Sequence, residues 1–358
     1  MNFAHAVVDL DDVEGLLAAD REGLLRAASM AGAQVRAAAA ALDEGELEPL
    51  RAGQPPRTVV WVAGRGTAER AGALLAAALG GTVGAPVVVA PDAPPWIGTL
   101  DVVILAGDDP GDPALASAAA TAVRRGARVV VVAPFEGPLR DATAGRAVVL
   151  APRLEVPDDF GLAHYLSAGL ATLRVVEPRL EMDLALLADE LDAEAMRNSA
   201  RRELFTNPAK NLADRMSGRE VVLAGDTAAT LALARHGAAM LLRVAHQPVA
   251  AVGLADALVA LRGGMGAQLG ADHESALFHD EQIDGPRPAA LRTFVLATDA
   301  ARPVVLARVS GLDDVDVIAA EDVPDVKAPT GSGHPEQQLA MMAVRLEMAA
   351  VYLKLVRG

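Results

Sequence analysis

The chain has no cysteine among its 358 residues, which removes several kinds of chemistry at once. Without a thiol there can be no disulfide, no thiolate nucleophile and no zinc–thiolate site. Aromatic residues make up only 3% of the chain, so its cores must be built from Ala, Val and Leu. No window approaches the ~20 uninterrupted apolar residues of a transmembrane helix, and the opening residues lack the positive charge of a secretory signal. These absences predict a cytoplasmic globular protein.

Positive charge is also scarce. The chain has 32 Lys and Arg residues against 47 Asp and Glu residues, and its formal net charge is -15. So acidic a chain repels nucleic acid and anionic membranes, so we expect neither as a partner. At this length the chain can hold two domains, each with its own core.

An α/β pattern fills most of the sequence. The segment Leu100–Val132 is typical of a buried strand, a loop, an alanine-rich helix and a second buried strand. Within it, Asp112 followed by Pro113 predicts the start of the helix. Further strands are expected at Thr58–Ala63, Pro86–Ala90 and Ala147–Leu150, with a helix over Thr67–Leu79. This alternation predicts a doubly wound parallel sheet.

A second α/β unit follows a helical stretch over 152–203. Its strands are expected at Glu220–Ala224, Met240–Val244, Leu291–Ala297 and Val304–Val309, and its helices at Asn207–Ser217, Ala228–Arg235, Ala251–Arg262 and Pro335–Val356. The sequence therefore predicts an α/β fold of two tandem three-layer domains with parallel sheets and flanking helices. The expected division is an N-terminal helical segment over 1–50, a first domain over 51–152, a helical connector over 153–205 and a second domain over 206–358.

Two loops in the first α/β pattern follow strands and precede helices, where open α/β sheets bind ligands. In the turn Gly64-Arg65-Gly66-Thr67, the glycines let a ligand approach the backbone, and Thr67 can cap the helix or donate to a phosphate. Arg70 stands where a third glycine of a dinucleotide-binding turn belongs. Capping alone would also explain Thr67.

The second loop, Gly107–Asp112, carries three aspartates. A helix start favours an anion, but these carboxylates would repel one. Asp108 and Asp109 can be solvated turn residues beside the capping Asp112, they can hold Mg²⁺, or they can bind sugar hydroxyls. The spacing matches no calcium-loop pattern, and we expect neither a metal site nor a cofactor.

A polar segment beginning at His279 follows the apolar Leu277-Phe278. A histidine beside acids can act as a general acid or base, although many such histidines are surface or capping residues. Two other histidines, His236 and His246, flank the strand expected at Met240–Val244, and either can face a pocket.

Three segments resemble one known family. They are TNPAKNLADRMSGREVVLAG (Thr206–Gly225), FHDEQIDG (Phe278–Gly285) and VYLKLVRG (Val351–Gly358), and they look like the dual-specificity phosphoglucose/phosphomannose isomerases of the sugar isomerase (SIS) superfamily. The resemblance implies two SIS domains, a sugar-phosphate ligand and a homodimer with a shared cleft. It places His279 on the histidine that opens the sugar ring. Gly64 and Thr67 fall on or beside the family's G-M-G-G-S turn, and Arg235 falls on the arginine that opens the family's R-W-K segment.

The sequence also departs from that family. The hydroxyl-rich S-Y-S-G-x-T loop aligns with Ala106–Asp112, where aspartates stand instead. The glutamate that moves the proton between C1 and C2 aligns with Met240–Arg243, where leucine stands. Loss of one positioned base typically costs ~10²–10⁴-fold in rate. Glu281 can substitute for that base, although its spacing does not show that it does.

Two functions follow. The first is a sugar-phosphate isomerase acting on glucose 6-phosphate or mannose 6-phosphate, with His279 and Glu281 as catalytic residues and weakened chemistry. Gly64, Arg65, Gly66, Thr67, Asp108, Asp109 and Arg235 would then bind the substrate. The second is a non-catalytic protein that binds a sugar phosphate or another carbohydrate derivative. A structural dimer with an empty cleft is a weaker third alternative.

Overall fold

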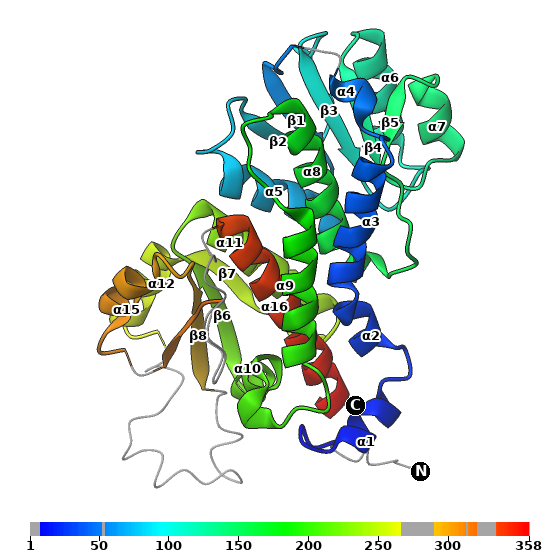
Figure 1. The fold of residues 1–358 in the computed structure, drawn as a ribbon. Coiled ribbons are helices and arrows are strands. Elements are labelled where there is room, and N and C mark those ends of the chain that lie inside the picture. Colours follow the sequence, from blue (N-terminus) through cyan, green and yellow to red (C-terminus); the bar gives the residue numbers. More distant parts are fainter. Residues whose placement is uncertain (1–7, 52–53, 266–289, 313, 321–333, 358) are drawn as a thin grey trace, which may run out of the picture. The chain divides into compact units, whose positions relative to one another are not determined.

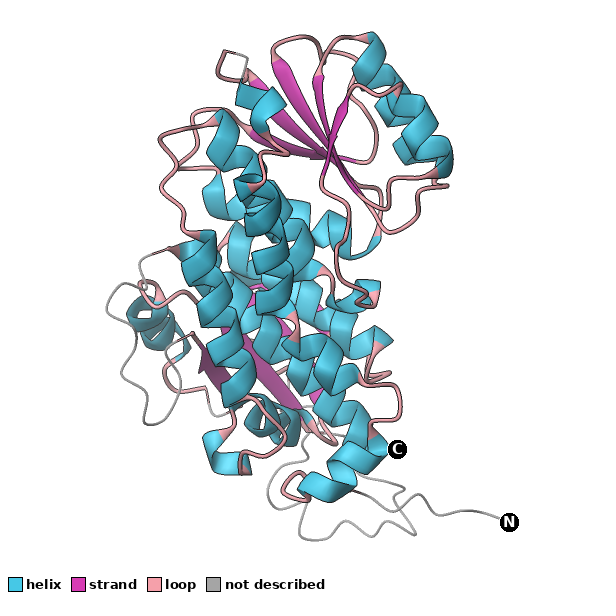
Figure 2. Cartoon of the chain, turned by 45° about the vertical axis from the view of Figure 1, so that its right-hand side comes forward, coloured by secondary structure: helices cyan, strands magenta, loops and turns pink. Residues whose placement is uncertain are grey.

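The computed structural model describes residues 8–51, 54–265, 290–312, 314–320 and 334–357. The chain packs as two compact units. The first-sheet unit is Arg26–Ala195, and the second-sheet unit is Met1–Leu25 with Met196–Gly358. Each contains one parallel sheet flanked by helices, as Figures 1 and 2 show. The fold class expected from the sequence is confirmed. Its four-part division stays a prediction; the packing itself joins most of 153–205 to the first sheet.

The sheet of the first-sheet unit has five parallel strands in the order β2-β1-β3-β4-β5. They are β1 (Thr58–Val62), β2 (Val87–Ala90), β3 (Asp101–Ala106), β4 (Arg128–Val132) and β5 (Ala147–Val149). The helices of this part of the chain are α2 (Leu24–Ser29), α3 (Ala31–Asp43), α4 (Glu48–Arg51), α5 (Gly66–Leu79), α6 (Pro113–Arg124), α7 (Gly137–Thr143), α8 (Leu162–Val176) and α9 (Leu184–Arg197), with a 3-10 turn η1 (Asp158–Phe160). The order of the strands reverses between β1 and β3, and ligands bind at such points in open α/β sheets.

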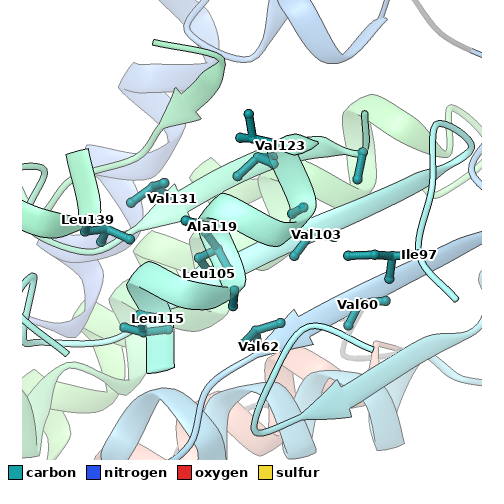
Figure 3. Packing of buried hydrophobic residues seen from close by; sticks show 14 of the residues in the cluster. Val60, Val62, Ile97, Val103, Leu105, Leu115, Ala119, Val123, Val131 and Leu139 are labelled. Carbon is teal, nitrogen blue, oxygen red and sulfur yellow. The ribbon is translucent and has the colours of Figure 1, made fainter. Parts of the chain in front are cut away.

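The two faces of this sheet are covered by different helices. On one face, buried Leu115, Ala119 and Val123 of α6 pack against valines and leucines of β1, β3 and β4 (Figure 3). On the other face, the Trp61 ring fits against Gly72 of α5 and Gly169 of α8, where any Cβ would lie within 3 Å of the ring. The alternation of side chains along β1 sends Val60 and Val62 to one face and Trp61 to the other.

The sheet of the second-sheet unit has four parallel strands among the described residues, in the order β7-β6-β8-β9. They are β6 (Glu220–Gly225), β7 (Ala250–Gly253), β8 (Leu291–Leu296) and β9 (Val315–Ile318). The helices are α1 (Val13–Ala19), α10 (Pro208–Met216), α11 (Ala228–Arg243), α12 (Leu254–Arg262), α15 (Arg302–Val309) and α16 (Pro335–Arg357), with a 3-10 turn η2 (Leu204–Thr206). Helices α12 and α15 pack on one face of the sheet through buried Leu258 and Val305.

Two expected strands are helical in the structure. Met240–Arg243 continues α11, because buried Gly237, Met240 and Leu241 follow helical spacing along one side. Residues 304–309 belong to α15, which has Pro303 in its first turn and buries Val305 and Val309, four residues apart. The short strands β7 and β9 are not among the expected elements, and residues 251–253, expected as the start of a helix, belong to β7, so that α12 begins at Leu254. No helix of the described ranges is long and apolar enough to span a membrane.

Candidate ligand-binding site

The carboxyl edge of the first sheet brings together the loops that the sequence singled out. Ala63–Arg65 follows β1, and Gly107–Asp112 follows β3, its neighbour in the sheet. Arg65 Nη2 lies 3.5 Å from an Asp109 carboxylate oxygen and 3.8 Å from one of Asp112. The structure therefore places the two predicted loops side by side and joins them by ion pairs. These distances are long and Arg65 is exposed, so the pairing is weak.

Each loop has one glycine at a position where a side chain would be strained or crowded. Gly66 has a φ of +72°, a conformation that side chains rarely adopt. At Gly107, a Cβ would lie 2.6 Å from Leu115 Cδ1 of α6. The first glycine lets the chain turn sharply into α5, and the second lets α6 approach the end of β3.

Thr67 does not have the capping role that was considered for it. The N-cap position of α5 is Arg65, which makes no side-chain capping bond, and Thr67 is completely buried in the first turn of the helix. Its hydroxyl accepts a hydrogen bond of 3.1 Å from the Arg70 guanidinium. The Thr67 side chain therefore faces the interior in this structure, and its binding of a ligand stays a prediction.

Both helix starts at this edge already have a carboxylate of the chain beside them. Asp112 caps α6 as expected, accepting from the Ala114 amide at 2.8 Å. Beside α5, the Asp158 Oδ2 atom lies 3.6 Å from the position of a Cβ on Gly66. Helix starts attract anions, and here the anions belong to the protein itself.

A pocket of about 250 Å³ lies next to these loops, entirely within the first-sheet unit. The ends of β3, β4 and β5 contribute to it through Asp108, Pro134 and the residues that follow β5. Its walls also include Gln34 of α3 and the amino end of α8. The lining residues are Gln34, Ala37, Asp108, Pro134, Pro152, Arg153, Leu154, Glu155, Val156, Asp158, Gly161, His164 and Tyr165. Asp108 is the only member of this lining that the sequence had proposed as a site residue.

Asp158 and Tyr165 form the main polar pair of the pocket. The Tyr165 hydroxyl donates to Asp158 Oδ1 at 3.0 Å. Burial, with Asp158 and Asp108 nearby, raises the pKa of the Tyr165 phenol, so the phenol stays protonated as a donor. Asp158 thus retains its second oxygen, on the side of Gly66, as an acceptor.

His164 contributes an imidazole to the same pocket. The residue is only partly buried, but its Nε2 atom is buried and has no hydrogen-bond partner in the structure. Burial lowers the pKa of His164 to about 4, so the ring is neutral at neutral pH. The backbone amide of His164 donates to the Gln34 side chain at 3.0 Å, and the Gln34 amide group donates to the Phe160 carbonyl at 2.9 Å.

Sequence reasoning missed Gln34, Asp158, His164 and Tyr165. The only signal was local: Asp158 and Asp159 precede a helical run in which His164 and Tyr165 are adjacent. The aspartates predict a helix start, whereas the role of Gln34, more than a hundred residues away, depends on packing.

Other predicted site residues lie elsewhere or cannot be placed. Arg235 is exposed on α11 of the second-sheet unit, so it does not line this pocket. His236 is completely buried and contacts Glu347 Oε1 of α16 at 2.9 Å, so it faces the core. His279 and Glu281 lie outside the described residues. Among the residues that are described, no group of three or more His, Cys, Asp or Glu side chains could hold a metal ion.

A second hollow, of about 200 Å³, lies in the second-sheet unit beside α10 and α16. Two of its lining residues are arginines whose side chains contact other groups of the same chain. Arg345 donates to the carbonyls of Ala319 and Ala320 at 2.9 and 3.0 Å, and Arg215 forms an ion pair with Asp316. These contacts give both arginines a structural role.

Comparison with known proteins gives the fold its context. No family model matches the chain, and no curated protein matches it. Solved structures do. Tagatose-6-phosphate ketose/aldose isomerase from Escherichia coli has 14% identity and a TM-score of 0.61, with 98% of this chain and 93% of that chain covered. The C-terminal domain of glucosamine-fructose-6-phosphate aminotransferase from Francisella tularensis has 12% identity, a TM-score of 0.60 and 96% coverage of both chains.

A third similar structure is a glucose-6-phosphate isomerase like protein from Thermus thermophilus. It has 20% identity and a TM-score of 0.54, with 98% of this chain and 94% of that chain covered. At these identities the likeness establishes architecture alone. Over nearly its whole length, the chain shares the fold of these three structures.

Proposed function

We propose that the chain is a carbohydrate-derivative-binding protein of the sugar isomerase fold, and that the pocket of the first-sheet unit is its ligand site. The observation that carries this proposal is the pair of chain carboxylates at the two helix starts, Asp112 at α6 and Asp158 at α5. The resemblance aligns the family's phosphate loop with Ala106–Asp112, so Asp112 belongs to the segment in which that family would hold its phosphate. The pocket keeps groups suited to sugar hydroxyls but lacks a phosphate cradle.

A thermal-unfolding panel tests this binding function. Free sugars, sugar phosphates and nucleotide sugars are added singly to the intact chain. A ligand at 100 times its Kd stabilises the native state by about 2.7 kcal/mol, so binding appears as a raised unfolding temperature. Ala37→Phe, which fills part of the pocket, should abolish the rise. The proposal fails if no member of the panel stabilises the protein, or if Ala37→Phe responds as the wild type does.

Aldose–ketose isomerisation of glucose 6-phosphate or mannose 6-phosphate is the second candidate. It is favoured by the FHDEQIDG segment and by the resemblance to the phosphoglucose/phosphomannose isomerases. In that function His279 opens the ring and Glu281 moves the proton. A coupled assay with both hexose phosphates should then show turnover that His279→Ala reduces by ~10²-fold or more. Turnover that survives His279→Ala would remove this mechanism.

The same resemblance leads us to propose a homodimer. Light scattering should give a mass near twice the 36.8 kDa of one chain. A mass equal to that of one chain at micromolar concentration would contradict this assembly.

A further inference from the structure

The charges that line the pocket of the first-sheet unit are mostly negative. Asp108, Glu155 and Asp158 are acidic, and Arg153 is the one basic residue of the lining. Arg153 donates to both carboxylate oxygens of Glu44, at 3.0 and 2.5 Å, and to Glu46 at 2.7 Å. The hydrogen bonds with Glu44 raise the pKa of Arg153 and lower that of Glu44. The charge of Arg153 is thus offset within the protein, and the pocket presents a net negative field.

The neutral polar groups of the pocket are largely engaged with the protein. The Tyr165 hydroxyl donates a hydrogen bond to Asp158. The Gln34 side chain donates to the Phe160 carbonyl and accepts from the His164 amide. What remains for a ligand is the outer oxygen of Asp158, the carboxylates of Asp108 and Glu155, and the His164 ring. Ionised carboxylates only accept hydrogen bonds, and the His164 ring forms part of the same lining.

Given the binding function proposed above, we infer that this pocket takes an unphosphorylated hexose or amino-hexose unit, whose hydroxyl or ammonium groups donate to Asp158 and Asp108 and whose ring lies against His164. A phosphate in this pocket would meet the carboxylates of Asp108, Glu155 and Asp158, and like charges placed against a competing ligand create specificity. The volume of about 250 Å³ lies just below the range of about 300–1,000 Å³ for drug-sized ligands, so it suits one sugar ring.

Ligand-observed NMR and calorimetry on the intact chain test the inference. The probes are glucose, mannose, glucosamine, glucose 6-phosphate and inorganic phosphate. At least one of the three unphosphorylated sugars should bind about tenfold or more tightly than glucose 6-phosphate. Asp158→Asn and His164→Phe should each weaken that sugar about tenfold, and His164→Gln should restore part of the loss. Asp108→Asn should reduce the difference in affinity between the free sugar and glucose 6-phosphate, because it removes one charge that repels the phosphate.

Asp141→Asn is the matched control, because Asp141 is an exposed acid of α7 in the same unit, outside the pocket lining. It should leave every affinity unchanged. If glucose 6-phosphate binds more tightly than glucose, mannose and glucosamine, this inference is overturned, while the proposed binding function still stands. Failure of every probe to bind would overturn the inference, and failure of the wider thermal panel would then overturn the proposed function as well.

Discussion

The two sheets have the same strand order, but the helices that follow their first strands begin in different ways. In both, the first strand lies inside, the second pairs on its outer side, and the third and fourth follow on the other side. In the second-sheet unit, the hydroxyls of Thr227 and Thr230 at the start of α11 form a capping box, and Asp226 accepts from Thr230. In the first-sheet unit, the start of α5 has no side-chain cap and opens beside Asp158.

Buried ionisable groups show the same contrast. The second-sheet unit encloses His236 with Glu347, and it buries Lys210, whose ammonium donates to the carbonyls of Ala200 and Arg202 at 2.8 and 2.7 Å. In the first-sheet unit, the Asp158–Tyr165 pair lines an open pocket. One topology can therefore place polar groups either in a closed core or in the lining of a pocket.

The largest expected loss of stability concerns the buried pair of His236 and Glu347 in the second-sheet unit. Glu347→Ala should lower the free energy of unfolding by about 3 kcal/mol, because it leaves the buried His236 Nε2 without its hydrogen-bond partner. Urea unfolding followed by far-UV circular dichroism measures the loss. Glu347→Gln keeps an acceptor oxygen and should cost less. Equal stability of Glu347→Ala and the wild type would contradict the role of the pair.

The next effect concerns pH and belongs to the pocket. Burial holds the pKa of His164 at about 4 in the folded state, against about 6.5 in an unfolded chain. Between these values the unfolded state binds more protons, so stability falls as pH falls. The cost should reach about 2–3 kcal/mol at pH 4.5. His164→Gln should lose less stability between pH 7 and pH 4.5 than the wild type, and an identical loss would refute the assignment.

A smaller effect is expected at the open pair. Tyr165→Phe removes a hydrogen bond to a carboxylate and should destabilise the protein by about 2 kcal/mol. Both tryptophans, Trp61 and Trp96, belong to the first-sheet unit, so their fluorescence follows unfolding of this unit. A loss as large as that of Glu347→Ala would erase the contrast between the closed pair and the open one.

The smallest effects compare helix caps. Asp112→Ala at α6 and Thr227→Ala at α11 should each cost about 1 kcal/mol, the usual value of a side-chain cap. Thermal unfolding of the two variants measures both. Asp112→Asn, which can still cap, should remain close to the wild type. If Asp112→Ala is neutral, the carboxylate at α6 is not a cap.

The sequence predicts the strands that are buried on both faces and the helices that begin at clear caps. Thr58–Val62 and Asp101–Ala106 are continuous buried runs, and Asn207 accepts from the Lys210 amide as a cap residue before Pro208 should. The two misassigned strands fail for a common reason. Residues 240–244 and 304–309 are rich in Val, Leu and Met, and short apolar runs suit a strand or a helix equally until their burial is known.

The sequence predicts the loops of the candidate site, but it does not predict the residues that α8 and the turn before it contribute. Its loops follow from the strand–loop–helix order, because parallel strands bring their carboxyl ends to one edge. Asp108 comes from that rule, whereas the pairing of Arg65 with Asp109 is seen only in the structure. Thr67 could not be oriented, because the glycines on either side of Arg65 allow several helix starts. The positions of Asp158 and His164 depend on how α8 packs on α3, which no local pattern contains.

Gln34 has a consequence for any attempt to isolate the ligand site. This residue of α3 holds the chain on either side of Gly161 through the Phe160 carbonyl and the His164 amide. A fragment trimmed to the strands and their crossover helices, starting at Thr58, would keep every aspartate of the acidic loop and still lose one wall of the cavity. The shortest stretch that retains all the lining residues starts upstream of the first strand, at α3, and continues into α8.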